Sequence, residues 1–599
     1  MIYHCEDHTC NYWDEGEKLP ERCPQCGRKL LRANEADMTG DDWTALGNTL
    51  WDAEASDKKR MVDCFRKAAY LGSAWGVCNL GICMEQGNGV EADPVQAFWL
   101  YQQAVEMGSL NAVCCLGVCY QYGIGTAPDA EKAAELYCKA AEYGSPRGQM
   151  LLARAFHDGI GVEADAAEAV HWVRAAAYQR YGEGMYRLGV CYEYGDGVEQ
   201  NWEHAVHWFR EAAESGVSTA MTDLGYCYEK GCGVEQSWEQ AFSWYRRGAE
   251  CGDLRSMHNL GYCYEKGRGV EQSWEQAFSW YRRGAECGYP VSMSNLGLCY
   301  KRGYGVDQNW QEAIKWYEQG AQCGDLQCMH NLACCYERGE GVEQNEDRAL
   351  YWYRRGAEAG SDYCMYCLGW NYSNGEGVEQ NMTEAIRWYT AAAEGGNADA
   401  MHDLGWLYDH GEGVEQDMKK AICWYERAAE QNHPAAMNSL GECYAMGRGV
   451  PRDLETAMEW YRRAAELGEA MADYNMGWHL EQAGKLSEAY AHYRKAADGN
   501  DDSAWWALGR FYENGVVVAQ DGKEARRCYE TGEKLGSVKC KMRLARCKLL
   551  GIGDRREKKA GLDLCRQALE LAKESSEKED YGYEAEMNLL RRTIAENES

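Results

Sequence analysis

Residues 226–252 read YCYEKGCGVEQSWEQAFSWYRRGAECG, and residues 262–288 read YCYEKGRGVEQSWEQAFSWYRRGAECG. The two stretches differ only where Cys232 in the first corresponds to Arg268 in the second. A reaction centre is normally assembled from unlike residues that the fold brings together once, whereas an architectural element is repeated along the chain. The near-identical copies therefore predict a repeat protein.

Loop glycines extend the same period over most of the chain. They stand 36 residues apart, most of them open a G-x-G-V loop, and they predict a regular array from about Ser73 to Gly468 with degenerate repeats on either side. The glycines are Gly87, Gly123, Gly159, Gly195, Gly231, Gly267, Gly303, Gly339, Gly375, Gly411 and Gly447.

Each period contains two stretches with the spacing of an amphipathic helix. Before Gly267, Met257 and Leu260 fall on one helical face, and after it Ala277 and Tyr281 do the same. A glycine at this place can adopt the left-handed conformation that ends a helix. Each repeat is therefore expected to be a pair of helices.

The second helix of the pair carries its own start signal. Ser273 can accept hydrogen bonds from the free amides of the first turn, and Gln276 can complete a capping box. In an earlier repeat, Asp93 followed by Pro94 offers a cap with proline at the first helical position. These signals place the helix starts shortly after each glycine loop.

The predicted fold is an all-α solenoid. A helix pair of this size cannot bury its apolar face alone, so neighbouring pairs must stack and share a continuous core. We expect about fourteen pairs. The predicted organisation is a small module at 1–31, a linker at 32–41, the solenoid at 42–573 and a capping helix at 574–599.

The composition favours a folded protein that polyanions repel. The 95 Asp and Glu residues outnumber the 63 Lys and Arg residues, which gives a net charge of −32. Such a charge disfavours phosphate backbones and anionic lipid surfaces, so we expect neither nucleic acid nor membrane as a partner. The amino terminus lacks a basic segment before an apolar core, and no stretch has the apolar length of a membrane span. We therefore expect a cytoplasmic protein.

The motifs L-G-x-x-Y, G-x-G-V, A-x-x-W-Y and A-x-x-G resemble those of the Sel-1-like repeat family, a relative of the tetratricopeptide repeat. The resemblance covers about Asp42 to Lys573. It implies a right-handed superhelix of antiparallel helix pairs that acts as a scaffold or adaptor for proteins and peptides. Because H-E-x-x-H, G-x-S-x-G and G-x-x-x-x-G-K motifs are missing, we expect no enzymatic activity. The alternative is a β-lactamase-like hydrolase related to secreted cysteine-rich members of the family.

Cysteine placement bears on that alternative. Nine cysteines share one slot, four residues before the loop glycine, and tetratricopeptide analogy places this slot at the helix packing interface, where a small hydrophobe fits. The second slot that bridging would require holds Cys251, Cys287 and Cys323, and then Ala359. We predict reduced packing cysteines, with disulfides or reactive thiols as the alternative. The nine are Cys83, Cys119, Cys191, Cys227, Cys263, Cys299, Cys335, Cys443 and Cys547.

The amino-terminal module contains Cys5, Cys10, Cys23 and Cys26 in a C-x4-C-x12-C-x2-C spacing. Four thiolates from two short loops can surround one tetrahedral ion, and a segment this small needs such a staple to fold. The module resembles a zinc ribbon or rubredoxin-type knuckle, and we expect a structural Zn²⁺. Iron, unbound thiols, and His4 or His8 as substitute ligands remain open.

Aromatic and histidine side chains flank the L-G pair of the first helices. By tetratricopeptide analogy these positions point into the concave groove, where they could bind an extended or helical peptide, and the surrounding acidic residues favour a basic one. The alternative is that the rings pack between adjacent first helices. The candidates are Tyr226, His258, Tyr262, Tyr366, Trp370, His402, Trp406, Tyr474, Trp478 and Trp506.

Overall fold

The described part of the chain consists of helices, apart from three short strands at its amino-terminal end. In the described residues, α1–α14 and α17–α30 form fourteen pairs of consecutive helices, and we call the odd-numbered helices first helices and the even-numbered ones second helices. The prediction of an all-α solenoid of helix pairs is confirmed. The computed structural model describes residues 2–5, 13–15, 30–32, 37–51, 55–578 and 584–598.

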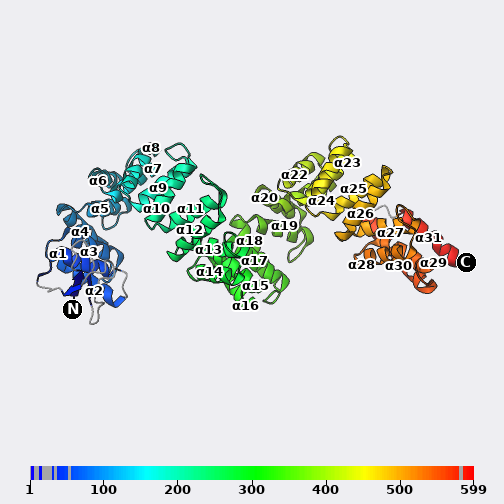
Figure 1. The fold of residues 1–599 in the computed structure, drawn as a ribbon, viewed down its shortest axis with the longest axis horizontal. Coiled ribbons are helices and arrows are strands. Elements are labelled where there is room, and N and C mark those ends of the chain that lie inside the picture. The colour runs from blue at the N-terminus through cyan, green and yellow to red at the C-terminus, as the bar shows by residue number, and fades with distance from the viewer. Residues whose placement is uncertain are drawn as a thin grey trace. The chain divides into compact units, whose positions relative to one another are not determined.

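Two compact units divide the chain, residues 1–309 and residues 310–599. Within each unit, every helix packs against the next one in sequence, so the pairs stack in chain order (Figure 1). Most helices have 13 residues, which gives each pair the same length and lets equivalent positions recur from pair to pair.

The helices of the first unit have the following bounds. Its first helices are α1 (Gly40–Thr49), α3 (Ala74–Gln86), α5 (Leu110–Tyr122), α7 (Pro146–Asp158), α9 (Gly182–Tyr194), α11 (Ser218–Lys230), α13 (Leu254–Lys266) and α15 (Pro290–Arg302). Its second helices are α2 (Ala55–Tyr70), α4 (Pro94–Glu106), α6 (Ala130–Glu142), α8 (Ala166–Tyr178), α10 (Trp202–Glu214), α12 (Trp238–Glu250) and α14 (Trp274–Glu286).

The second unit continues the alternation. Its first helices are α17 (Leu326–Arg338), α19 (Asp362–Asn374), α21 (Ala398–His410), α23 (Pro434–Met446), α25 (Ala470–Gln482), α27 (Asp502–Asn514) and α29 (Val538–Leu550). Its second helices are α16 (Trp310–Gln322), α18 (Glu346–Glu358), α20 (Met382–Glu394), α22 (Met418–Glu430), α24 (Leu454–Glu466), α26 (Leu486–Asp498), α28 (Gly522–Lys534) and α30 (Lys558–Lys578), and α31 (Glu584–Glu598) follows.

The predicted helix boundaries are present in the structure. Gly267 ends α13 in the left-handed conformation, with φ of 66°, and its amide donates to the carbonyl of Cys263. Ser273 caps α14 by accepting from the amide of Gln276, while its own hydroxyl donates to Glu275 at 3.0 Å. Local chemistry therefore sets both ends of the loop, as the sequence predicts.

A buried tyrosine explains why most first helices carry a glycine in their L-G pair. In the pair α13–α14, a Cβ added to Gly261 would lie 2.7 Å from the ring of Tyr281. That ring is 0% exposed, and its hydroxyl donates to Glu265 at 2.8 Å. Glycine thus admits the ring between the two helices. The equivalent fully buried tyrosines are Tyr101, Tyr137, Tyr245, Tyr281, Tyr317, Tyr353, Tyr425, Tyr461, Tyr493 and Tyr529.

Arg268, the residue that distinguishes the second quoted stretch from the first, contacts two aromatic rings. Arg268 lies in the loop between α13 and α14, with its guanidinium 4.4 Å from the ring centre of Trp238 on the preceding pair and 5.3 Å from that of Tyr262. In the next repeat, Tyr304 occupies the same loop position and stacks on Trp274 at 4.2 Å. In these two repeats the loop position therefore ties a pair to the previous one through an aromatic ring.

The two ends of the described chain depart from the repeat. Strands β1 (Ile2–Cys5), β2 (Trp13–Glu15) and β3 (Leu30–Arg32) form an antiparallel sheet in the order β2-β1-β3. At the other end, α31 packs on α29, where Arg543 binds Glu586 through two hydrogen bonds of 2.7 and 2.8 Å. The helix α30 extends to Lys578, beyond the boundary expected at residue 573.

Candidate functional site

The ten candidate groove residues fall into two rows, the fifth and the ninth positions of the first helices. The fifth-position side chains are at most half exposed, and four of them lie against the buried tyrosine of their own pair. The ring-centre distances are 5.6 Å for His258 and Tyr281, 5.7 Å for Tyr366 and Tyr389, 5.8 Å for His402 and Tyr425, and 5.6 Å for Tyr474 and Tyr493.

The fifth-position residues also make contacts with side chains outside their own helix pair. Tyr366 donates its hydroxyl to Asp403 on the next first helix at 3.1 Å, and His402 stacks on His433 at 5.1 Å. Trp506, the fifth member of this row, lies under two cations, with Arg510 at 4.6 Å from its ring centre. These contacts support packing as the role of this row.

The ninth-position residues are placed differently. Each directly follows the glycine of the L-G pair, which is Met476-Gly477 before Trp478, and four of the five expose more than a third of their surface. Tyr262 is the half-buried member, beneath Arg268. The exposed fractions are 42% for Tyr226, 46% for Trp370, 38% for Trp406 and 38% for Trp478. We call these five residues the ninth row.

The surroundings of the ninth row in the second unit are polar and partly acidic. Trp406 stacks on His410 at 4.3 Å, one turn along α21. Asp399, on the first turn of the same helix, keeps 58% of its side chain exposed and contacts His433. Trp406 thus offers a flat apolar surface on a helix that also exposes a carboxylate.

A pocket of about 430 Å³ opens where α17 and α19 begin. Its wall includes Asp325, which directly precedes α17, and Gln327 and His330 of α17. Asp362 and Tyr363 of α19 line the other side. Tyr363 is exposed, and its ring centre lies 5.9 Å from that of His330. Two carboxylates beside an exposed ring form a site that suits a cationic side chain.

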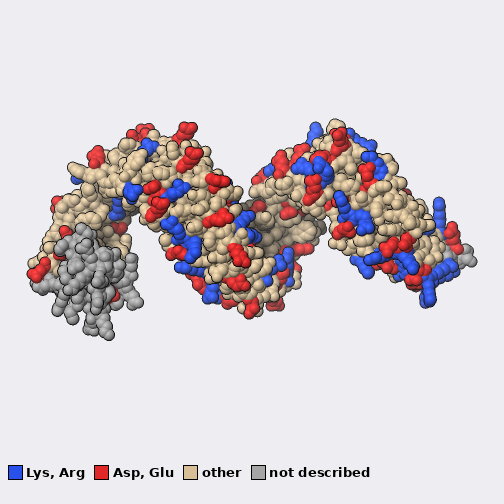
Figure 2. Space-filling view, in the orientation of Figure 1, with Lys and Arg blue, Asp and Glu red and all other residues tan. Residues whose placement is uncertain are grey.

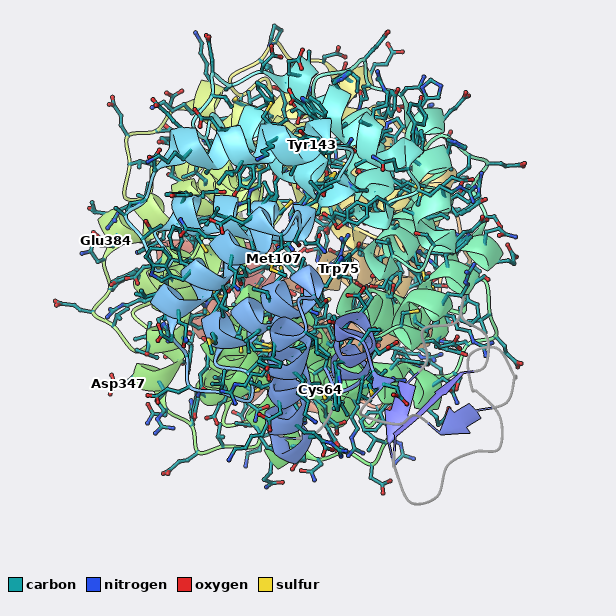
Figure 3. The ribbon with its side chains drawn as sticks, turned by 90° about the vertical axis from the view of Figure 1, so that its left-hand side faces the viewer. Cys64, Trp75, Met107, Tyr143, Asp347 and Glu384 are labelled. Atoms are coloured by element: carbon teal, nitrogen blue, oxygen red, sulfur yellow. The ribbon has the colours of Figure 1, made fainter. Side chains whose placement is uncertain are left out.

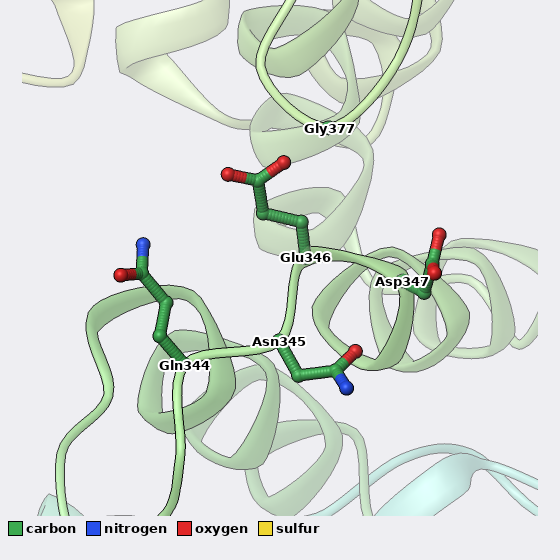
Figure 4. A pocket seen from close by; sticks show the side chains of 5 residues that line it. All are labelled: Gln344, Asn345, Glu346, Asp347 and Gly377. Atoms are coloured by element: carbon green, nitrogen blue, oxygen red, sulfur yellow. The ribbon is translucent and has the colours of Figure 1, made fainter.

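A second pocket, of about 450 Å³, lies at the glycine loops of the second unit and is lined by Gln344, Asn345, Glu346, Asp347 and Gly377 (Figure 4). Glu346 is the first residue of its second helix, where neighbouring repeats carry tryptophan or methionine. The pocket is therefore polar. Within the described residues, no group of three or more His, Cys, Asp or Glu side chains could hold a metal ion.

Further apolar residues are exposed outside the two rows of the first helices. Met107 and Tyr143 directly follow the second helices α4 and α6 as their C-caps, and Trp75 lies in the first turn of α3 (Figure 3). Met107 and Tyr143 each precede a turn glycine with positive φ. A bulky residue directly before this turn glycine is the sequence signal that could have identified them.

The cysteine slots differ in burial. Eight of the nine first-slot cysteines are buried, Cys191 is half-buried, and the second-slot residues Cys251, Cys287 and Cys323 are exposed. Burial raises the pKa of Cys263 and Cys299 to about 12, as expected for packing thiols. All 26 cysteines with described side chains are free thiols.

The predicted metal ligands lie almost entirely outside the described residues. Cys5 ends strand β1, and its backbone pairs with Leu30 of β3. Cys10, Cys23 and Cys26 are not among the residues that the structure describes. The zinc site therefore stays a prediction.

Charge is unevenly distributed along the chain. Residues 522–573 contain fifteen Lys and Arg residues and seven Asp and Glu residues, although the whole chain is strongly acidic. Figure 2 shows Lys and Arg side chains gathered over the last helices. A basic partner is therefore favoured by the repeats before α28 and disfavoured by those after it.

Comparison with known proteins identifies the repeat. The Sel1 repeat profile matches thirteen segments between residues 76 and 537. A protective antigen of uropathogenic Escherichia coli with an SLR fold is 32% identical, with 75% of this chain and 97% of that one covered and a TM-score of 0.51. A Sel1 repeat protein from Oxalobacter formigenes is 30% identical, with coverages of 41% and 96% and a TM-score of 0.37.

Two negative findings complete the comparison. No curated protein matches the chain. Among the helices of the described residues, none combines the length and the apolar character that crossing a bilayer requires.

Proposed function

Since the chain belongs to the Sel1 repeat family, we propose that it is a non-catalytic scaffold that binds a protein or peptide on the surface formed by its first helices. The observation that supports this most directly is the exposure of the ninth row. Its rings recur at one helical position, whereas the fifth-position rings beside them are packed against buried tyrosines. Exposed aromatic rings in a repeated row are typical anchors for an extended or helical segment.

The preferred partner is a basic peptide segment. Trp370 and Trp406 offer ring faces that attract a lysine or arginine, and the pocket beside Tyr363 places two carboxylates next to an exposed ring. The net charge of −32 adds a long-range attraction for a cationic partner. Because this attraction is electrostatic, we expect binding to weaken as salt is raised.

The double change Trp370→Ala with Trp406→Ala tests the ninth row. A partner captured from native extract by the wild-type protein should bind the double variant about tenfold more weakly or worse, because two anchor rings are lost. Titration of the purified partner, followed by fluorescence anisotropy, measures the affinity. The far-ultraviolet circular dichroism and the melting temperature should stay nearly unchanged, since both rings are exposed.

The matched control is Trp99→Ala, which removes an exposed tryptophan from the second helix α4. This variant should bind like the wild type. Normal binding by the double variant would show that the ninth row is not the site. A large fall in its melting temperature would show that Trp370 and Trp406 are packing residues.

We further propose that Cys5, Cys10, Cys23 and Cys26 hold one structural zinc ion in a ribbon-like module. Two observations support this: the paired thiol spacing of the sequence, and the small antiparallel sheet in which Cys5 ends the central strand. Four thiolates match the preference of Zn²⁺ for tetrahedral sulfur ligation. The free thiols of the solenoid support a reducing, cytoplasmic location for the protein.

Changing Cys23 and Cys26 together to serine should abolish metal binding. Elemental analysis should find about one zinc per wild-type chain and almost none in the variant, because two ligands cannot retain the ion. The variant Cys251→Ser with Cys287→Ser removes two exposed solenoid thiols and should keep its zinc. Chelation should leave most of the helicity intact, because the solenoid has its own core. Full zinc occupancy in the Cys23 and Cys26 variant would refute the assignment.

A further inference from the structure

Two cysteines and an arginine meet on three successive first helices of the first unit. Cys78 on α3 and Cys115 on α5 belong to one buried cluster, with 2% and 5% of their surfaces exposed. Arg147, on the first turn of α7, donates from Nη1 to the Sγ of Cys115 at 3.6 Å. The buried Cys115 sulfur is therefore in contact with a residue that reaches the surface.

The same three positions recur three first helices further along the chain, with other residues. There Tyr186 donates its hydroxyl to Asp223 at 2.9 Å, and Arg255 contacts the other oxygen of Asp223 at 3.2 Å. The spacings are 37 and 32 residues in both sets. Asp223 is the acceptor between a hydroxyl and a guanidinium, so in that repeat the position equivalent to Cys115 holds an acidic group.

This correspondence assigns the proton arrangement of the pair. A thiol at Cys78 takes the place of the tyrosine hydroxyl, and a thiolate at Cys115 takes the place of the carboxylate. The Cys78 thiol and then Arg147 lower the pKa of Cys115 against the opposing effect of burial, to about 7. Cys119, one turn away on the same helix, lacks this environment, and burial raises its pKa to about 12.

Other charged and titratable groups also act on the pair. Glu85 opposes the thiolate, and Cys114 and Cys119 on the same helix are held protonated by burial. The groups that face Cys115 are Cys78 and Glu85 of α3, Tyr101 of α4, Cys114 and Cys119 of α5, and Arg147 of α7.

We propose that Cys115 is a peroxide-reactive thiolate and that Cys78 is its resolving partner. The Cys115 sulfur attacks one oxygen of hydrogen peroxide, which forms Cys–SOH and releases hydroxide. The Cys78 thiol then attacks that sulfur, which forms the disulfide and releases water. The two electrons that the sulfurs lose reduce the peroxide. The product joins α3 to α5 and leaves Arg147 without its anion.

The reactivity is tested on the full-length protein by brief alkylation with iodoacetamide between pH 5.5 and 9.5, followed by mass spectrometry of each cysteine. Cys115 should react with a midpoint near pH 7, and at that pH about tenfold or more faster than Cys119. In Arg147→Leu the midpoint should rise by about one pH unit, whereas Arg147→Lys should restore much of the wild-type profile. A shift of the midpoint pH reports a change in the stabilisation of the Cys115 thiolate. A change in the access of iodoacetamide to Cys115 alters only the plateau rate at high pH.

The resolving step is tested with hydrogen peroxide. Wild-type protein should yield a peptide cross-linked through Cys78 and Cys115, and Cys78→Ser should instead yield a dimedone adduct at Cys115. In Cys115→Ser, Cys78 should stay reduced. The proposal is overturned if Cys115 is oxidised no faster than Cys119, if the Arg147→Leu midpoint equals that of the wild type, or if Cys115 pairs with a cysteine other than Cys78.

Discussion

Replacing Gly269 with alanine should destabilise the pair α13–α14 by about 3 kcal/mol or more. Gly269 has φ of 70°, which costs an L-residue about 1 kcal/mol. The added Cβ would also lie 2.1 Å from the carbonyl oxygen of Trp238, at the start of the preceding second helix. A backbone atom at that distance cannot rotate away, so the loop must move off its neighbour.

The matched control is Gly288→Ala. Gly288 has φ of 88° in the turn after α14, and a Cβ there would meet nothing within 4 Å. The Gly288→Ala variant should lose only about 1 kcal/mol of stability, which is the cost of a positive φ for an L-residue. Hydrogen exchange measured by mass spectrometry on peptides from α12–α14 reports local opening, which suits a long array better than one global transition. Equal losses of stability for the two variants would show that the close approach of Gly269 to the preceding repeat does not restrict the residue at this position.

The fold could be predicted because its determinants are local and repeated. A glycine that ends α13 at φ of 66° and a serine that caps α14 act within a few residues, so each copy carries the complete signal. The role of Arg268 could not be predicted in the same way. Its ring partner Trp238 belongs to the preceding repeat, 30 residues earlier in the sequence. The contact of Arg268, which stands where the previous repeat has Cys232, is therefore visible only when the pairs are stacked.

The candidate site was predicted only in outline for a related reason. The fifth and ninth positions are both aromatic and both flank the L-G pair, so their residue types do not separate them. Four residues rotate a helix by only about 40°, and both positions lie near one face. His402 and Trp406 differ in their contact with the second helix. The buried ring of Tyr425 on that helix lies against His402, whereas Trp406 is 38% exposed. Burial at these positions is a tertiary property.

Replacing Tyr281 with alanine should cost the pair α13–α14 about 3–5 kcal/mol, because the ring is fully buried and neighbouring atoms cannot fill the space it leaves. Tyr281→Phe keeps the ring and removes only the hydroxyl that donates to Glu265 at 2.8 Å. It should cost about 1 kcal/mol, since Glu265 retains Lys266 at 2.7 Å. Urea-dependent hydrogen exchange of α13 and α14 measures both losses.

Tyr226→Ala removes an exposed ring from the ninth row and provides the second comparison, with an expected loss below about 1 kcal/mol. Together the three variants separate volume, hydrogen bonding and surface exposure at the same kind of side chain. If Tyr281→Phe were as damaging as Tyr281→Ala, the bond to Glu265 would be the main contribution and the L-G glycine would have another purpose. If Tyr226→Ala were equally damaging, the ninth row would belong to the core, and a binding surface would have to be sought elsewhere on the first helices.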